Sequence, residues 1–531
     1  MNKIGSILPL LGFLVVGGWF AYVFNSYPVE TAIRADATIK YEKTRQWLDH
    51  GSFYYQYPQA MDPEARGIPY HLSGAMPHLS SFKGKKAITY PESFAILTGG
   101  WVSLAGPSTL FLLPILFLLL EVVLFYFVAV RFLRLAPLLA TGGGILLLFA
   151  TPHFIQDLQL QEMTVASSLT LAAVAISLRE KFSIFAAFSA ALLMGIAFSM
   201  RQEAAVPALL LFGLIILRSR NQGRGSDGWL ATLKSGPVLT FALVFALCLG
   251  LYLWYNWVLY EAPLGSRYYA VKESDPALAS RWHILKSVLV GNFDARRPIL
   301  GLVGQMPFLF IALLLWPLCH KRMQQSGQQL WIFGLLSALL IGLIAPNDSW
   351  GGWGQRFTMV IHPELLLGFL AVVSASKNME GPGLRRAAVS VLGLSILAAL
   401  MLARFGWKLE NSTLQYTTEL QTDLQSLPKG PVISADDIYY WGGLQYFARP
   451  LLQIKENQDP ASTMDYFLEH SRKAGYNRLF IHESQQFPDS KKQITMKAIA
   501  EVHRLGLKTE PTVPDQGTQR FLEVKLSGPA Q

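Results

Sequence analysis

Long apolar runs separated by short polar loops dominate the first 405 residues of the chain. A membrane-spanning helix needs roughly 20 predominantly apolar residues. By this measure the sequence predicts about eleven spans, at residues 4–24, 108–130, 136–151, 163–178, 182–200, 204–217, 237–259, 299–319, 329–345, 357–376 and 387–405. The pattern is typical of an α-helical polytopic membrane protein.

Arginine and lysine residues gather in alternate loops, and this asymmetry predicts the orientation of the spans. One set of loops holds Lys3, Arg131, Arg134, Arg179, Lys181, Arg218, Arg220, Arg224, Lys234, Lys321, Arg322, Lys377, Arg385 and Arg386. The opposite short loops hold only Arg201 and Arg356. Because cytoplasmic loops carry the excess of positive charge, we expect a cytoplasmic N-terminus and, after eleven crossings, an extracytoplasmic C-terminus. The long loops 25–107 and 260–298 then face outward as well.

Composition supports this assignment and narrows the place of function. Hydrophobic residues make up 52% of the 531-residue chain and charged residues only 15%, against about 25% charged in soluble domains. The net charge of +10 would suit a nucleic-acid partner. The positive residues, however, lie between apolar runs, where they set the orientation of the spans in the bilayer, so no nucleic-acid partner is predicted. The cytoplasmic loops leave little room for a site, so we expect function on the outward face. Short loops without long insertions favour a bacterial inner membrane.

The sequence changes character at residue 406, where charge returns and apolar runs shorten. "GPVISA", "PLLQIK", "RLFIHES" and "FLEVKL" are typical of strands, whereas "STMDYFLEHSRKAG" and "KKQITMKAIAEVHRLG" are typical of helices. This alternation predicts a small extracytoplasmic α/β domain at 406–531, after a membrane domain at 1–405. It has no glycine-rich phosphate loop, so no nucleotide is assigned to it.

Asp36 leads the candidates for chemistry, because it follows the first span directly in "ETAIRADATIKYEK". An ordinary solvated aspartate is the simpler interpretation. If this segment is a helix, however, Lys40 and Tyr41, at i+4 and i+5, would lie on the same helix face as Asp36. The alternative is a catalytic carboxylate just above the membrane surface, with Tyr41 as a secondary candidate and Asp49 as a weaker rival.

Further acidic residues stand where "TPHFIQDLQLQEMTVASS" enters the span 163–178. Asp157 and Glu162 would be favourable there in any case, since negative charge stabilises a helix N-terminus. Glu162 is the closer of the two to the hydrocarbon, where a charge without a role is expensive.

Basic residues at the outward ends of spans predict a place for an anion. Arg201 and Glu203 separate two apolar runs, either as a structural ion pair or with Arg201 facing a cavity. Arg356 ends a loop rich in glycine and tryptophan, and arginine is the preferred bidentate partner for phosphate. The cluster "FKGKK", which ends at Lys86, would attract anionic membrane lipids or a lipid-linked phosphate.

Taken in order along the first 375 or so residues, the motifs resemble the GT-C superfamily of polytopic glycosyltransferases, which take sugars from polyprenyl-phosphate carriers. Within this superfamily, the chain is similar to the protein mannosyltransferase and aminoarabinose transferase branches. The resemblance is carried by "RADATIKYEKTRQWLDHGSFYY", "KKAITYPESFAILTGGWVSLAGPSTLFLLP", "TPHFIQDLQLQEMTVASS", "GIAFSMRQEA", "WYNWVLYEAPLGS" and "GGWGQRFTMVIHPEL".

The resemblance implies a role for each matched residue. Asp36 falls where the family has its catalytic aspartate, the general base that deprotonates the acceptor. Glu162, or in its place Asp157, falls where a second acidic residue places the acceptor or a divalent metal ion. The basic residues implied at the donor phosphate are Arg201 and Arg356, whereas Lys86 is a candidate for that phosphate from its charge and its place in the first loop.

The chain also departs from the family pattern. Many members have Asp-Glu where this chain has Asp36-Ala37, and the lipid A branch has Glu-Lys-Pro where this chain has "TYPES", with Glu92 beyond the proline. These departures leave the substrate and a metal site open. Glu92 is kept as a secondary candidate, and no cofactor beyond an optional divalent ion is expected.

The predicted function is the transfer of a hexosyl or pentosyl group from a polyprenyl-phosphate carrier to a lipid, glycan or protein acceptor on the extracytoplasmic face. A glycan ligase or polymerase is a close alternative. A flippase or transporter of lipid-linked sugar is the other, and Glu121, inside a predicted span, is the residue that would suit it. A structural membrane subunit would leave Asp36, Glu162, Arg201 and Arg356 unexplained as a set.

Overall fold

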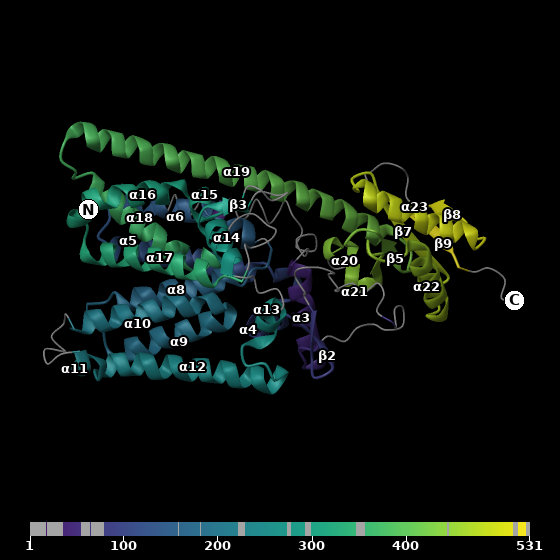
Figure 1. Cartoon of the computed structure of the whole chain (residues 1–531), viewed down its shortest axis with the longest axis horizontal. Coiled ribbons are helices and arrows are strands. Elements are labelled where there is room, and N and C mark those ends of the chain that lie inside the picture. The colour runs from purple at the N-terminus through teal and green to yellow at the C-terminus, as the bar shows by residue number, and fades with distance from the viewer. Residues whose placement is uncertain are drawn as a thin grey trace.

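The computed structural model describes residues 17–18, 36–54, 64, 79–157, 159–180, 182–220, 229–272, 278–292, 299–346, 356–442, 445–512 and 519–526. Almost all of the first predicted span, 4–24, lies outside these residues. Within them, a bundle of apolar helices is joined by one long helix to a five-stranded sheet, with a layer of short elements between (Figure 1).

The bundle is built from helices that match the remaining apolar runs. They are α5 (Leu112–Arg131), α6 (Pro137–Phe149), α8 (Met163–Ser177), α9 (Ile184–Met200), α10 (Ala205–Ser219), α12 (Gly236–Tyr260), α15 (Leu302–Gln305), α16 (Pro307–Cys319), α17 (Gln325–Ile344) and α18 (His362–Ser376). Short helices link them: η2 (Pro107–Thr109), α7 (His153–Asp157), η3 (Gln202–Ala204), α11 (Trp229–Leu233), η5 (His320–Arg322) and η6 (Phe357–Ile361).

The outer surface of the bundle is apolar, as a lipid-facing surface must be. On α12, Leu243, Leu247 and Leu251 recur every four residues and are 68%, 61% and 54% exposed. Such a continuous apolar stripe is unfavourable in water. Among the described residues, six helices are long and apolar enough to cross a membrane, and three shorter apolar helices accompany them. The chain is therefore an integral membrane protein, while the total of eleven spans stays a prediction.

A layer of short elements covers one end of the bundle (Figure 1). It contains α3 (Asp36–His50), the antiparallel hairpin of β1 (Leu79–Phe82) and β2 (Lys85–Ile88), α4 (Glu92–Ala105), α13 (Gly265–Lys272), α14 (Leu278–Leu289), and the pair β3 (Gly291–Asn292) and β4 (Ile299–Leu300). Three of the charged candidates, Asp36, Lys86 and Glu92, lie in this layer.

One helix of 45 residues, α19 (Pro382–Ser426), leads from the bundle to the sheet (Figure 1). Its buried positions, such as Leu392, Ala399, Leu414 and Leu424, keep one face along its whole length. The predicted boundary at residue 405 falls inside this helix, and the division into two domains there stays a prediction.

The sheet has the strand order β6-β5-β7-β9-β8. The strands β5 (Val432–Ser434), β6 (Leu451–Gln453) and β7 (Arg478–Ser484) are parallel, whereas β9 (Gln519–Lys525) is antiparallel to both β7 and β8 (Thr509–Pro511). Its helices are α20 (Ile438–Trp441), α21 (Gln445–Ala448), α22 (Pro460–Lys473) and α23 (Asp489–Arg504). The four predicted strands fall on β5, β6, β7 and β9, and the two predicted helices on α22 and α23.

Two apolar clusters form on the sheet. One, which includes Phe467, Ile481 and Val502, packs the sheet against α22 and α23. The other joins the sheet and the end of α19 to the layer that covers the bundle; it comprises Ile39, Ile88, Tyr90, Leu420, Leu424, Leu427, Val432, Ile438, Leu451, Phe480 and Phe521. We call this second group the docking cluster.

Candidate active site

The helix α3 is unusual because it is polar and yet buried. Lys40 and Lys43 are 2% and 0% exposed, so each ammonium group needs partners inside the protein. Lys43 Nζ contacts Glu92 Oε1 at 2.6 Å and donates to the carbonyl oxygens of Ile88, at 2.9 Å, and Tyr90. Glu92 also accepts from the Tyr260 hydroxyl at 2.8 Å. These contacts fix α3 to the segment that precedes α4.

Asp36 begins α3, where its negative charge is favourable at a helix N-terminus. Arg356 Nη1 donates to Asp36 Oδ2 at 2.8 Å, and both side chains are 14% exposed. Arg356 stands directly before η6, so this pair joins two of the predicted site residues across 320 positions of sequence. The glycine-rich loop 351–355 lies outside the described residues.

Glu162 is completely buried at the start of α8 and is surrounded by cations. Its Oε2 lies 2.6 Å from Lys40 Nζ, and its Oε1 lies 2.9 Å from Arg201 Nη1 and 3.3 Å from Arg267 Nη1. Burial alone would raise the pKa of the Glu162 carboxyl, but the three cations hold that pKa well below its usual range. Glu162 is therefore an ionised anchor for basic side chains.

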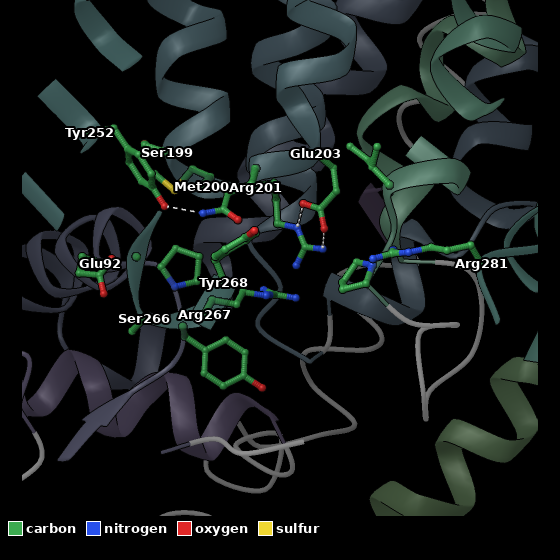
Figure 2. Close-up of a pocket in the computed structure, with 16 residues that line it drawn as sticks. Glu92, Ser199, Met200, Arg201, Glu203, Tyr252, Ser266, Arg267, Tyr268 and Arg281 are labelled. Carbon is green, nitrogen blue, oxygen red and sulfur yellow. Dashed lines mark hydrogen bonds and ion pairs between the residues drawn. The ribbon is translucent and has the colours of Figure 1, made fainter. Parts of the chain in front are cut away.

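Arg201 is an ion-pair partner and a cavity residue at once, so both interpretations of its motif apply. It binds Glu203 through two contacts, Nε to Oε2 at 3.1 Å and Nη2 to Oε1 at 2.8 Å. Its guanidinium lies 5.7 Å from the centre of the Phe357 ring. Arg201 also lines the cavity shown in Figure 2.

This cavity has a volume of about 280 Å³ and lies where α4, α9, α12, α13 and α14 end or begin. Figure 2 shows the Arg201 and Arg267 side chains ending close together, with Tyr252 and Tyr268 nearby. Both arginines share the single Oε1 of Glu162. The charge cluster is made up of Asp36, Lys40, Glu162, Arg201, Glu203, Arg267 and Arg356. It has more cations than carboxylates, so its cavity suits an anion.

The remaining predicted residues are distributed around this cluster. Glu92 lines the cavity but is engaged by Lys43 and Tyr260. Tyr41 lies in the apolar core of the bundle and not among the residues that line the cavity. Lys86 lies on β2 and Asp157 ends α7, and the side chains of both lie outside the described part of the chain.

Sequence reasoning missed two cations of the site. The sequence indicates Lys40 only as a neighbour of Asp36. In the structure Lys40 bridges α3 to the turn before α8, through Glu162, Gln161 Oε1 at 2.5 Å and the Leu160 carbonyl at 3.2 Å. Arg267 is one of several basic residues in the loop 260–298, and nothing in its local sequence distinguishes it.

The donor set does not fit a divalent metal ion. Lys40, Arg201 and Arg267 surround Glu162, the acid that the family resemblance places beside an ion, and so occupy the positions that such an ion would need. Among the described residues there is no group of three or more His, Cys, Asp or Glu side chains that could hold a metal. No catalytic step is assigned to a metal here.

Similarity to solved structures identifies the fold. No family model and no curated protein matches the sequence. The chain is, however, similar in structure to ArnT from Cupriavidus metallidurans, crystallised bound to undecaprenyl phosphate, with a TM-score of 0.53 and 12% identity over 98% of this chain and 99% of that one. The chain has the GT-C fold.

Two further GT-C structures are similar at lower scores. The apo state of the same ArnT gives a TM-score of 0.49 at 13% identity, covering 97% of this chain and 100% of that one. The oligosaccharyltransferase AglB from Archaeoglobus fulgidus, in complex with an inhibitory peptide and a dolichol-phosphate, gives 0.45 at 11% identity, covering 92% and 70%. The similarity to ArnT bound to undecaprenyl phosphate, at a TM-score of 0.53, confirms the GT-C resemblance of the sequence motifs as a likeness of fold.

Glu42 gives a test of the buried state of α3. Burial raises the pKa of its carboxyl to about 7, against an opposing hydrogen bond from Gln46 Nε2 at 2.6 Å. The folded protein thus keeps a proton that the unfolded chain releases, so the free energy of unfolding should fall as pH rises from about 4.5 to about 7. Glu42→Gln should remove this fall, which is about 3 kcal/mol at most. Unfolding of both proteins at about pH 5 and about pH 8 measures it; an equal fall in both would contradict it.

Proposed function

We propose that the protein is a membrane glycosyltransferase that moves a sugar from a polyprenyl-phosphate carrier to an acceptor hydroxyl on the extracytoplasmic face. The observation that carries this proposal is the position of Asp36 in the same charge cluster as an arginine-lined cavity at the ends of membrane helices. A carboxylate for the acceptor and cations for a phosphate are the two parts that such a transfer needs. Undecaprenyl phosphate bound to the similar ArnT structure supports the choice of carrier.

The proposed reaction is a displacement at the anomeric carbon of the sugar. The acceptor oxygen forms a bond to this carbon, and the bond from the carbon to the phosphate oxygen breaks. Asp36 takes the proton of the acceptor hydroxyl, and the polyprenyl phosphate leaves with the electron pair. The departing phosphate gains a negative charge, which nearby cations stabilise more strongly than they stabilise the bound donor. Inversion requires Asp36 and the cations on opposite sides of the sugar.

The geometry supports a division of labour among the charged residues. Arg356, 2.8 Å from Asp36, favours the ionised carboxylate that a base requires and orients it. Arg201 and Arg267 reach the cavity and are proposed to bind the donor phosphate. Lys86 stays a further candidate for that phosphate. Glu162 is proposed to hold Lys40 and the two arginines in place, so that it acts on the donor through them.

Glu121 was the residue that would suit a transporter, and its contacts favour a structural role. It is fully buried in the bundle, accepts hydrogen bonds from Ser167 at 3.2 Å and Ser168 at 3.3 Å, and lies 3.5 Å from His153 Nδ1. These are the contacts of a buried hydrogen-bonding residue. The transferase therefore stands as the proposed function, with a hexosyl or pentosyl donor.

Binding of the carrier tests the donor site directly. Arg267→Ala should weaken binding of polyprenyl phosphate by about 10- to 100-fold, because it removes a charge-assisted contact to the phosphate. The affinity of the purified protein for polyprenyl phosphate in detergent measures this change. Arg322→Ala is the matched control, since Arg322 pairs with Glu380 on the surface and should leave the affinity unchanged. Equal affinity of wild type and Arg267→Ala would move the phosphate site elsewhere.

A further inference from the structure

The helix that carries Asp36 is anchored by the C-terminal part of the chain. Ile39, one turn after Asp36, belongs to the docking cluster together with Leu420 of α19 and Ile438 of α20. All three side chains are fully buried. The helix α20 packs against α3, and Figure 1 shows α20 beside α3, between the bundle and the sheet. The apolar side of α3 near Asp36 is thus covered by the C-terminal part.

The turn that presents Glu162 has a similar contact with α19. Gln159 Nε2 donates to both carboxylate oxygens of Glu410, at 3.2 Å each. In the same turn Leu160 has a positive φ of 53°, which a branched side chain adopts only when its surroundings impose it. Its carbonyl accepts from Lys40. This turn is therefore held between α3 on one side and α19 on the other.

These contacts add to the ion pairs that hold α3 against α4 and against the Glu162 turn, and they act at the end of α3 that carries Asp36. A helix of 15 residues is marginal in isolation. Asp36 and Ile39, three residues apart, are neighbours on the helix surface, so a displacement of Ile39 displaces Asp36 with it. Misplacement of a catalytic group by about 1 Å can lower a rate by about 100-fold.

We propose that the C-terminal sheet, acting through α19 and α20, positions the Asp36 helix and the Glu162 turn, so that the reactive arrangement forms only when the docking cluster is packed. Ile39, Ile438 and Glu410 are then positioning residues. The catalytic consequence rests on the proposed glycosyl transfer, whereas the mechanical coupling of the sheet to α3 does not depend on it.

Two matched variants separate positioning from general destabilisation. Ile438→Ala opens the docking cluster, and Ile481→Ala removes the same atoms from the cluster between the sheet and its own helices. The two side chains are 0% and 1% exposed. Hydrogen exchange of the α3 amides in the full-length protein reports the position of α3 whether or not transfer occurs. Initial rates over a range of donor concentrations report kcat and KM.

Ile438→Ala should speed hydrogen exchange in α3 by about tenfold or more and lower kcat by about tenfold or more. The KM for the donor should stay within about threefold of the wild-type value. Ile481→Ala should change neither the exchange in α3 nor kcat. Equal exchange in α3 for the two variants would overturn the proposal, as would faster exchange with an unchanged kcat. If the wild type transfers no sugar, the proposed function fails, and the exchange comparison still decides the coupling.

Glu410 provides a second test that leaves the apolar clusters intact. Glu410→Ala removes the acceptor of Gln159 and should lower kcat by about threefold or more, since a hydrogen bond to a charged group is stronger than one between neutral groups. Glu410→Gln keeps an acceptor oxygen and should restore most of the rate. Equal rates for wild type and Glu410→Ala would show that α19 does not position the Glu162 turn.

Discussion

Replacing Asp36 with asparagine is expected to lower the rate of sugar transfer by about 10²- to 10⁴-fold while the protein still folds. The amide has the shape of the carboxyl and keeps an oxygen for Arg356, which donates to Asp36 at 2.8 Å. It does not accept a proton from the acceptor hydroxyl at neutral pH. Initial rates with saturating donor in proteoliposomes, together with the unfolding temperature of each protein, measure both parts of this expectation.

Asp49 supplies the control for this substitution. It lies on the same helix, is exposed, and pairs with Arg45 at i,i+4 over 2.8 Å. Exposed pairs of this kind contribute little, so Asp49→Asn should keep the rate within about twofold of wild type. Turnover close to wild type in Asp36→Asn would reject Asp36 as the base.

Removal of the Glu162 charge is expected to have the largest effect on stability. Glu162→Gln leaves Lys40, which is 2% exposed, without the carboxylate 2.6 Å from its ammonium group. Breaking one side of a buried ion pair lowers the free energy of unfolding by about 3–5 kcal/mol, because the other charge stays buried without compensation. Unfolding in mixed micelles with increasing SDS measures the difference between the two proteins.

A double variant distinguishes a broken ion pair from simple loss of packing. Lys40→Met with Glu162→Gln removes both charges, and Arg201 keeps its contacts with Glu203. The double variant should be more stable than Glu162→Gln alone, because the uncompensated ammonium group of Lys40 is gone. If the two substitutions destabilise additively, Lys40 and Glu162 do not act as a pair.

The individual candidates of the site could be predicted, but their pairing could not. Asp36, Glu162, Arg201 and Arg356 each stand at the outward end of an apolar run, which is a local property of the sequence. The structure pairs Arg201 with Glu162 and Arg356 with Asp36, and Lys40 interacts electrostatically with members of both pairs. Contacts across such distances in sequence depend on how helices pack, so the sequence does not reveal that Arg356 faces Asp36 or that Lys40 reaches Glu162.

The fold, too, is predictable from the sequence only in part. Apolar runs locate most helices, because length and hydropathy are local. Composition predicts a boundary at residue 405, where charge returns. The helix α19 continues there because no proline follows Pro382 until Pro428 and because isolated glycines such as Gly406 are tolerated within a helix. The change in composition marks a change of surroundings and not the end of the helix. The packing of the sheet on Ile39 has no local signal at all.

The most direct test of the account follows a radiolabelled sugar from a panel of polyprenyl-phosphate donors in proteoliposomes that contain the purified protein. We expect label from at least one donor to move to an acceptor and an equal amount of polyprenyl phosphate to be released. Passage of the intact labelled donor across the bilayer, with no carrier released, would contradict glycosyl transfer and assign the protein to transport of lipid-linked sugar.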